Sequence, residues 1–239
     1  MTNKIFFIPG TMCNEQLWSS LYEEPCIDDT PVFLSIPNHK PFEQIAQHIL
    51  SFLPAEKINL VGFSLGGYIA SYLACFHPER FEKVLVIANS PTALNEQELT
   101  QRQHLVDWVN RHGYNGMSRQ KAINFLDNTQ PETYAFSDRE KIIQLILDMD
   151  QALGQETLLS QMLNTTHRES LVGRLSQIAV PVTFYASEQD SLVNWSSLKK
   201  LVNINPNHKI KLSKGSGHML PLEKPQELAR HIASWLRNA

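Results

Sequence analysis

The hydrophobic positions of the chain fall into short runs that alternate with longer amphipathic stretches. Six runs are apolar and rich in β-branched or aromatic residues, as in buried strands: residues 4–8, 32–36, 58–63, 84–89, 182–186 and 209–212. Most intervals between them have the apolar spacing of helices: residues 42–53, 65–77, 195–202 and 226–236. This alternation predicts an α/β fold, in which helices cover both faces of a mostly parallel sheet.

One interval interrupts the alternation. Between the fourth and fifth expected strands, roughly ninety residues pass without a convincing strand, which is too long for an ordinary connection. Three helices are expected there: residues 95–111, 117–126 and 137–153. An insertion at the carboxyl end of a strand is most simply a helical cap over a binding site. We therefore expect a core made of residues 1–90 and 178–239, with residues 91–177 forming a cap or lid.

Composition narrows the class of protein. The 239 residues are 42% hydrophobic, which is enough for a substantial core, and the net charge of −3 lacks the basic excess of a nucleic-acid-binding protein. No window approaches a membrane span, and the apolar stretch near the start is too short for a signal peptide, so a cytoplasmic location is expected. Cys13, Cys26 and Cys75 form no CxxC pair and are expected to be reduced. With no metal-ligand spacing, neither a metal nor a cofactor is expected.

A serine stands where the third expected strand meets its helix, in the stretch GFSLGG at residues 62–67. Gly62 and Gly66 leave room for a sharp strand-to-helix turn, which would hold the hydroxyl of Ser64 outward beside a helix N-terminus. A glycine turn of this kind also occurs for close packing alone. The strand before it and the helix after it favour a nucleophile at Ser64.

A serine nucleophile needs a base, and the base needs an acid that orients it. Of the nine histidines, His218 alone both follows an expected strand and lies in a glycine-rich turn, at the same sheet edge as Ser64. The loop after the fifth strand offers Asp190, with Glu188 as the alternative. The sequence therefore predicts a catalytic set of Ser64, Asp190 and His218, in the chain order typical of such sites.

The negative oxygen of a tetrahedral intermediate needs hydrogen-bond donors. The first strand ends in a Pro-Gly turn, and Thr11 follows it directly. The backbone N–H groups of Thr11 and of Leu65, the residue after the serine, are the expected oxyanion donors. An ordinary strand-ending turn is the alternative interpretation of the first of these.

Five stretches together give the chain a resemblance to the α/β-hydrolase superfamily: PGTMCNEQLW, GFSLGG, FHPERF, SEQD and GSGHMLPLEKP. It is most similar to small capped serine carboxylesterases, a group that includes the methyl ester esterases acting on pimeloyl-acyl carrier protein. Two features depart from the family pattern. Pro9 stands where many members have histidine, and the chain begins at what is the family's third strand, which implies a sheet of about six strands.

These residues and the resemblance imply a serine hydrolase that cleaves carboxylic esters of small or medium acyl groups through an acyl-enzyme intermediate. A thioesterase, or a C–C bond hydrolase or lyase, could use the same groups on other carbonyl compounds. A ligand receptor that keeps the catalytic residues but turns over slowly is an alternative from another class. Trp18, Phe63, Leu192 and Met219 adjoin the catalytic loops and are candidates for an apolar acyl pocket, although core packing would explain them equally well.

The expected cap also carries a cluster of cations. Residues 102–121 contain Arg102, Arg111, Arg119 and Lys121 against a single carboxylate, Asp107. Such a face could dock an acidic acyl carrier protein, and a solvated helix surface is the alternative. The expected partners are thus a small-molecule ester and, on the cap, an acyl carrier protein, with neither a nucleic acid nor a membrane.

Overall fold

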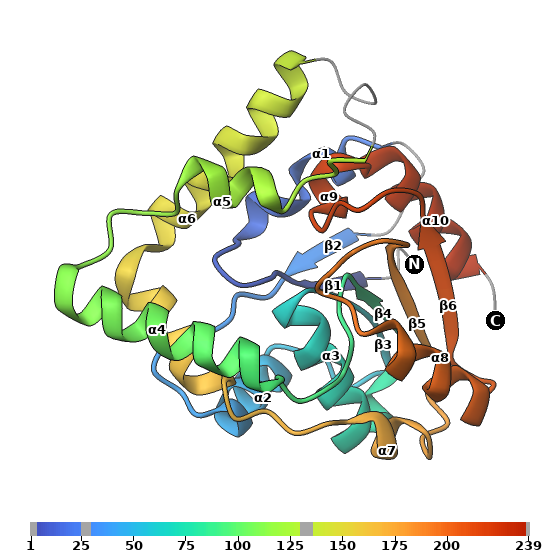
Figure 1. The fold of residues 1–239 in the computed structure, drawn as a ribbon. Helices are drawn as coiled ribbons and strands as arrows, with labels where there is room; N and C mark the ends of the chain where they lie inside the picture. Colours follow the sequence, from blue (N-terminus) through green and yellow to red (C-terminus); the bar gives the residue numbers. More distant parts are fainter. Residues whose placement is uncertain (1–3, 25–29, 130–135, 238–239) are drawn as a thin grey trace.

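The structure is a computed structural model that describes residues 4–24, 30–129 and 136–237 (Figure 1). Cys26 lies outside these ranges. Six strands form one sheet: β1 (Lys4–Ile8), β2 (Thr30–Phe33), β3 (Ile58–Phe63), β4 (Phe81–Ile87), β5 (Val182–Ser187) and β6 (Lys209–Ser213). Their order is β2-β1-β3-β4-β5-β6, and every neighbouring pair is parallel. The predicted α/β architecture with about six strands is confirmed.

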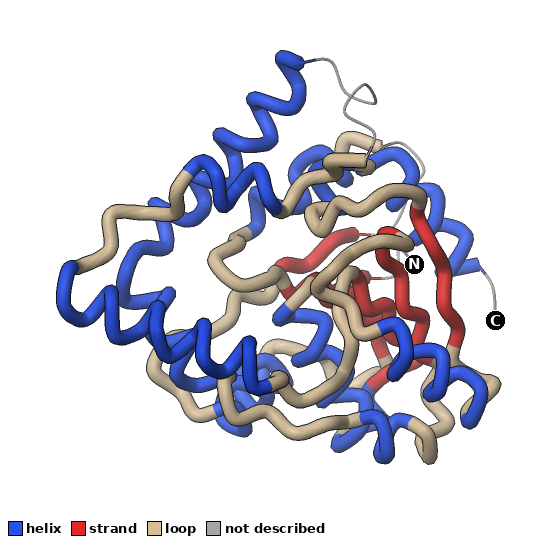
Figure 2. The backbone as a smooth tube through the Cα atoms, viewed as in Figure 1, coloured by secondary structure: helices blue, strands red, loops and turns tan. Residues whose placement is uncertain are grey.

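Helices flank the strands on both sides (Figure 2). Those of the core are α1 (Ser19–Tyr22), which follows the 3₁₀ turn η1 (Glu15–Trp18), α2 (Phe42–Ser51), α3 (Leu65–Phe76), η2 (Pro78–Arg80), α7 (Val172–Leu175), α8 (Trp195–Ile204), α9 (Leu220–Glu223) and α10 (Pro225–Arg237). The three between β4 and α7 are α4 (Glu96–His112), α5 (Arg119–Asn124) and α6 (Phe136–Thr165). Within the described ranges, no helix is both long and apolar enough to traverse a bilayer.

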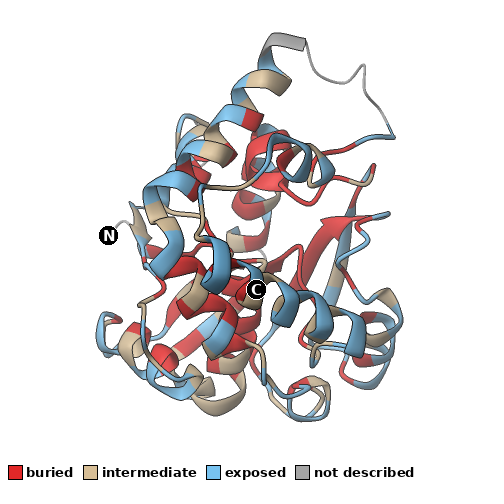
Figure 3. Cartoon of the chain, turned by 60° about the vertical axis from the view of Figure 1, so that its left-hand side comes forward, coloured by how far each residue is buried: buried red, intermediate tan, exposed pale blue. Residues whose placement is uncertain are grey.

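Strand alternation divides the core between the two faces of the sheet. On β1, Phe6 and Ile8 pack with α2, α3, α7 and α8, whereas Ile5 and Phe7 pack with α1, α9 and α10. Successive side chains of a strand point to opposite faces, so a strand that is apolar at every position is buried on both. The buried segments accordingly lie inside, and exposed helix faces lie outside (Figure 3). Because all six strands are parallel, their carboxyl ends lie along one edge of the sheet, and the predicted site residues follow strands at this edge.

The helices α4, α5 and α6 extend away from the sheet, on the left of Figure 1. Helices α4 and α6 share a small apolar cluster with the loop after β1: Met12, Val106, Val109, Leu158 and Met162. Ala122 of α5 packs instead in the core cluster that contains Ile5 and Phe7. Leu171 and Leu175 pack in the core cluster that contains Phe6 and Ile8. The division into a core of residues 1–90 and 178–239 and a cap of residues 91–177 stays a prediction.

Helix α6 is divided at Gly154, where φ is 68° and the backbone is not helical. The hydrophobic pattern predicts a helix over residues 137–153, so its predicted end coincides with this break. Helical structure resumes after Gly154 and runs to Thr165. The resumed part was missed because it mixes buried polar residues, such as Ser160 and Gln161, with the apolar ones.

Candidate active site

Ser64 occupies the junction between β3 and α3 in a strained conformation, with φ 50° and ψ −115°. Its N–H donates to the carbonyl oxygen of Ile87 on the neighbouring strand, 2.9 Å away. A Cβ on Gly62 would lie 2.2 Å from the carbonyl oxygen of Gly66, and a Cβ on Gly66 would lie 2.4 Å from that of Ile8. These glycines are therefore required for the turn that presents the serine hydroxyl at the end of the sheet.

Three side chains from distant parts of the chain form a continuous hydrogen-bonded row. The Nε2 of His218 lies 3.2 Å from the Oγ of Ser64, and its Nδ1 lies 2.8 Å from the Oδ2 of Asp190. Asp190 is 2% exposed and His218 is 7% exposed, whereas the alternative acid Glu188 is exposed. An Nδ1–H donated to Asp190 leaves Nε2 free to accept the serine proton. The geometry thus brings together the residues that sequence reasoning selected.

Local hydrogen bonds and rings hold the acid and the base in this orientation. The other oxygen of Asp190, Oδ1, accepts the backbone N–H of Leu192 at 2.9 Å. The N–H of His218 donates to the carbonyl oxygen of Phe125 at 2.8 Å, and the imidazole lies 5.3 Å from the ring of Phe63, centroid to centroid. Because Phe125 belongs to the segment after α5, the helical layer helps to fix the histidine.

The expected oxyanion donors line the same cavity as Ser64. Leu65 opens α3, and the first N–H groups of a helix have no partner within it. Next to Thr11, Met12 has φ 54°, and its N–H donates to the Oε1 of Gln161 at 2.9 Å. The roles of Thr11 and Leu65 stay predictions. Gln161 of α6 holds the loop after β1 through this bond, and its part in the site was not predicted from the sequence.

A cavity of about 370 Å³ opens above the serine and has Phe63, Leu192 and Met219 in its wall. Trp18, the fourth residue predicted for the pocket, does not line it. Its side chain is fully buried in the core, 5.0 Å from the ring of Phe7, because η1 turns this face toward the sheet. The prediction of Trp18 as a pocket residue is corrected accordingly.

Cys13 is a second potential nucleophile in the cavity wall. Burial, with a smaller contribution from the carboxylate of Asp150, raises the pKa of its thiol to about 12. A thiol with this pKa stays protonated near neutral pH and is a poor nucleophile. Cys13 is therefore a weaker candidate nucleophile than Ser64, whose role stays a prediction.

The four cations predicted to form a docking face differ in their surroundings. Arg102 and Lys121 line the cavity. Arg119 donates to both carboxylate oxygens of Glu140 at 2.6 Å, and Arg111 donates to the backbone carbonyl of Asp107 at 3.1 Å. Arg111, Arg119 and Lys121 are exposed, so a docking face for an acidic carrier stays a prediction that rests on these three.

Two buried carboxylates, those of Asp127 and Glu223, lie against the loop that precedes His218. Asp127 accepts the N–H and the hydroxyl of Ser216, at 3.2 and 3.0 Å, and its own N–H donates to Glu223 at 2.6 Å. Burial, with a smaller contribution from the charge of Asp127, raises the pKa of Glu223 to about 7. For Asp127, burial acts to raise the pKa, but hydrogen bonds from Thr129 and Ser216 outweigh it and lower the pKa. The sequence did not predict this carboxylate pair, and the glycines on both sides of Ser216 were its only indication of close packing here.

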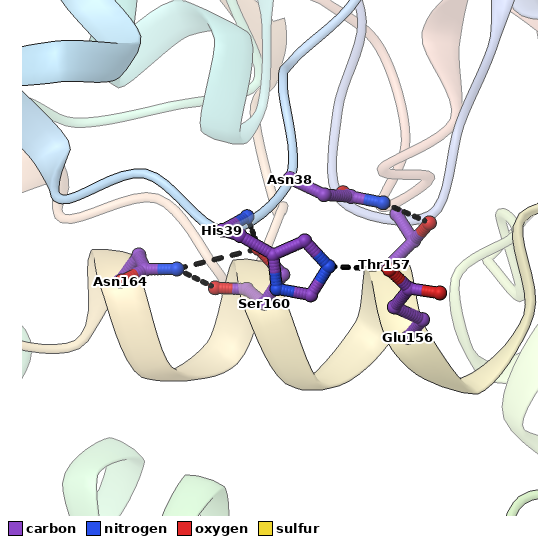
Figure 4. A network of polar contacts seen from close by, with 6 residues as sticks. All are labelled: Asn38, His39, Glu156, Thr157, Ser160 and Asn164. Carbon is purple, nitrogen blue, oxygen red and sulfur yellow. Dashed lines mark hydrogen bonds and ion pairs between the residues drawn. The ribbon is translucent and has the colours of Figure 1, made fainter.

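A polar network ties the loop after β2 to the second half of α6 (Figure 4). It consists of Asn38, His39, Glu156, Thr157, Ser160 and Asn164. The Nδ2 of Asn38 donates to the hydroxyl of Thr157 at 2.9 Å, and the N–H of His39 donates to that of Ser160 at 2.6 Å. The imidazole of His39 also contacts the carboxylate of Glu156. These bonds hold residues 155–165 against the core.

No group of three or more His, Cys, Asp or Glu side chains suited to bind a metal ion occurs in the part of the chain that the structure describes.

Comparison with known proteins gives a family and several relatives. A family model described as the alpha/beta hydrolase fold matches residues 40–225. The biotin biosynthesis bifunctional protein BioHC of Teredinibacter turnerae is 22% identical over 258 residues, which covers 98% of this chain and 44% of that protein. The pimeloyl-[acyl-carrier protein] methyl ester esterase of Citrobacter koseri is 30% identical over 95 residues, covering 36% and 37%. The matches thus span less than half the length of these two relatives.

A third relative and two solved structures extend the comparison. The 2-succinyl-6-hydroxy-2,4-cyclohexadiene-1-carboxylate synthase of Yersinia enterocolitica is 26% identical over 202 residues, covering 78% of this chain and 71% of that protein. A thermophilic esterase from Thermogutta terrifontis has a TM-score of 0.79 at 19% identity, covering 99% and 90% of the two chains. The enol-lactonase from Burkholderia xenovorans has a TM-score of 0.80 at 14% identity, covering 100% and 92%. These structures establish a common fold.

Proposed function

The chain belongs to the α/β-hydrolase fold family, and we propose that it is a serine esterase that cleaves carboxylic esters of small or medium acyl groups. The observation that carries this proposal is the row of contacts from Ser64 Oγ to His218 Nε2, 3.2 Å, and from His218 Nδ1 to Asp190 Oδ2, 2.8 Å. A hydroxyl, an imidazole and a buried carboxylate in this order are the groups that acyl transfer needs.

In the first half of the reaction, Ser64 Oγ attacks the ester carbonyl carbon while His218 Nε2 takes the hydroxyl proton. The carbonyl oxygen becomes negatively charged and accepts hydrogen bonds from the N–H groups of Thr11 and Leu65. The bond between the carbonyl carbon and the alcohol oxygen then breaks, and His218 gives its proton to the departing alcohol. This leaves the acyl group on the serine.

In the second half, water attacks the acyl-serine and His218 takes one of its protons. The tetrahedral intermediate collapses, the bond to Ser64 breaks, and the serine recovers its proton from His218. Asp190 stays ionised in both halves, where it holds the imidazole in the required tautomer and stabilises its positive form. The burial of Asp190 and His218 strengthens these electrostatic interactions.

We propose that residues 91–177 act as a cap for this site. Leu105 of α4 and Leu158 and Met162 of α6 contribute apolar wall to the cavity, opposite the nucleophile turn. A cavity of about 370 Å³ lies at the small end of the range for small-molecule sites, which suits a small or medium acyl group.

Other carbonyl chemistry on the same residues is the second candidate. The synthase relative from Yersinia enterocolitica matches 78% of this chain, so a C–C bond lyase or hydrolase is a specific alternative to the esterase. A thioester is a further alternative, and a carrier-bound acyl group is consistent with the relative named for pimeloyl-[acyl-carrier protein]. The cross-class alternative is a slow receptor that keeps the same residues.

An activity panel with a serine variant tests the proposal. The protein and its Ser64→Ala variant would be assayed with p-nitrophenyl, methyl and thioesters of increasing acyl length, together with fluorophosphonate labelling. We expect turnover of oxygen esters that Ser64→Ala abolishes. Undiminished hydrolysis by the variant would refute the assignment, and labelling without turnover of any ester would favour a receptor.

A further inference from the structure

The wall of the catalytic cavity contains a buried polar side chain that has no partner. Asn89 is 8% exposed and lines the cavity together with Ser64. Its Oδ1 accepts no hydrogen bond among the residues that the structure describes. Asn59 and Glu223 also have such a buried oxygen, but they lie outside this cavity. Because an unpaired buried amide is costly, an oxygen in this state beside the nucleophile indicates a ligand that supplies the missing donor.

The turn that carries Asn89 is imposed by its surroundings. β4 ends at Ile87, and the next residue, Ala88, has φ 51°. Ser64, which follows the neighbouring strand β3, has φ 50°. A residue with a side chain keeps this conformation only where neighbouring contacts hold it, and here the N–H of Ala88 donates to the carbonyl oxygen of Tyr185 at 2.9 Å. Two adjacent strands thus end in strained residues, and both turns contribute to the cavity wall.

Contacts on both sides fix the position of the Asn89 side chain. The hydroxyl of the next residue, Ser90, accepts the N–H of Asn194 at 2.9 Å. A Cβ placed on Gly67, in the first turn of α3, would lie 3.0 Å from the Cβ of Asn89, so the side chain packs closely against this helix. The amide is therefore positioned by the fold before a substrate binds, which lowers the cost of recognition.

Strand order determines which part of a substrate Asn89 faces. Thr11, the proposed oxyanion donor, follows β1, Ser64 follows β3, and Asn89 follows β4. These strands are neighbours in that order, and neighbouring strands lie about 4.8 Å apart. The amide of Asn89 is therefore near the atoms bonded to the ester carbonyl carbon, on the side of Ser64 opposite to the carbonyl oxygen.

We propose that Asn89 hydrogen-bonds a hydroxyl group of the substrate that lies close to the ester bond. This inference deepens the proposed esterase function and rests on it. An asparagine amide has both an acceptor and donors, and a hydroxyl is the smallest substituent that matches both. The preferred substrate is thus a hydroxy ester, with its hydroxyl on the second or third carbon of the acyl part or on the second carbon of the alcohol part.

Pairs of esters in which a methyl group replaces the hydroxyl test the proposal. One arm compares ethyl 2- and 3-hydroxybutyrate with ethyl 2- and 3-methylbutyrate, and the other compares 2-hydroxyethyl butyrate with propyl butyrate. We expect kcat/KM of the hydroxylated ester to exceed that of its partner by at least ~10-fold in one arm, because a methyl group leaves the buried amide unpaired. The arm that shows the preference identifies the half of the substrate that carries the hydroxyl. Equal rates in both arms would overturn the proposal.

Variants assign the preference to Asn89. Asn89→Leu and the smaller Asn89→Ala both lose the amide, so the ratio of kcat/KM within the preferred pair should fall by ~10-fold. Asn89→Asp keeps an acceptor for the hydroxyl and should retain part of the ratio. Asn59→Leu is the matched control, since Asn59 on β3 has the same unpaired oxygen outside the cavity, and its ratio should equal that of the wild type. An unchanged ratio in Asn89→Ala, or an equal loss of kcat/KM for both esters of the pair, would contradict the proposal.

A binding measurement separates this inference from the esterase proposal. Ketone analogues of the ester pairs, in which a methylene replaces the ester oxygen, need no catalysis and can be titrated into the Ser64→Ala protein by NMR. We expect the hydroxylated ketone of one pair to bind at least ~5-fold more tightly than its partner, and added Asn89→Ala to remove this difference. If Ser64→Ala still hydrolyses esters while the difference depends on Asn89, only the esterase assignment fails. If hydrolysis depends on Ser64 but both ketones of every pair bind equally, the inference fails.

Discussion

The backbone N–H of Met12 donates to the side-chain oxygen of Gln161, and so a residue of α6 holds the loop that follows β1. Met12 has a positive φ of 54°, a conformation that a residue with a side chain adopts only when its surroundings impose it. The neighbouring N–H, that of Thr11, is a proposed oxyanion donor. The position of this donor thus depends on a side chain that lies 149 residues beyond Met12.

Replacing Gln161 should therefore lower catalysis more than substrate binding. Gln161→Met removes the acceptor, and we expect kcat for a p-nitrophenyl ester to fall by ~10-fold, with KM within about twofold, since the loss concerns the transition state. Gln155→Met is the control, because Gln155 also accepts a backbone N–H, that of Tyr114, at 2.8 Å, away from the loop. Equal kcat values for both variants would show that Gln161 has no part in positioning the loop.

Asp190 and Glu188 can be distinguished by amide substitution. Asp190→Asn keeps the shape but loses the charge that orients and stabilises His218, so kcat should fall by ~10³- to 10⁴-fold near pH 7. Glu188→Gln, on an exposed residue two positions earlier, should stay within about twofold. Steady-state kinetics on one ester suffices, and the reverse ranking of the two variants would reassign the acid.

Gly66 should tolerate no side chain. A Cβ there would lie 2.4 Å from the carbonyl oxygens of Ile8 and Pro9, so both the nucleophile turn and the loop after β1 would have to shift. We expect Gly66→Ala to lower Tm by at least ~6 °C and to lose most activity. Gly173→Ala is the control, since a Cβ on this α7 residue would meet nothing within 4 Å, and its Tm should be unchanged or slightly higher. Similar Tm values for the two variants would contradict the close approach.

Glu223 should make the protein less stable as pH rises through the weakly acidic range. Its pKa is raised from 4.5 to about 7 in the folded protein, so between these values the folded state holds a proton that the unfolded state has lost. The free energy of unfolding should therefore fall with rising pH from about 4.5 to about 7, by up to ~3 kcal/mol. Denaturant titrations at a series of pH values measure this slope.

Glu223→Gln should flatten that slope and be the more stable protein above pH 7, because its amide cannot ionise and can still accept the N–H of Asp127. Glu82→Gln, on an exposed residue of β4, should keep the wild-type slope. A wild-type stability that is constant or rises between pH 4.5 and 7 would contradict the raised pKa.

The sequence predicted best the elements that are buried on both faces of the sheet, because their hydrophobic runs are continuous. β3 and the start of α3 agree with their predicted bounds at Ile58, Phe63 and Leu65, and this unit carries the serine. β4 was predicted at residues 84–89 but spans Phe81–Ile87. Its polar start conceals the strand, since Glu82 is exposed and Lys83 bonds to the carbonyl oxygens of Trp235 and Leu236. Its end at Ala88, which has φ 51°, has no sequence signal because alanine rarely adopts this conformation.

Within the candidate site, residues at strand ends could be predicted, and residues contributed by packing could not. Ser64, Asp190 and His218 follow strands whose carboxyl ends share one edge, so topology alone brings them near each other. Gln161, and Arg168 in the cavity wall, come from a helix and a loop whose position depends on how the helical layer lies over the sheet, which no local pattern specifies. For the same reason Trp18 could not be assigned to the core or the cavity from its neighbours in sequence.

The interruption of α6 at Gly154 gives its two halves different neighbours. Residues 155–165 are hydrogen-bonded to the loop after β2 through Ser160 and to the loop after β1 through Gln161. Residues 138–153 line the cavity through Asp150, and their Ile143, Ile146 and Met149 pack in the core cluster that contains Phe7. Natural variation on the two sides of Gly154 is therefore expected to change different parts of the cavity wall.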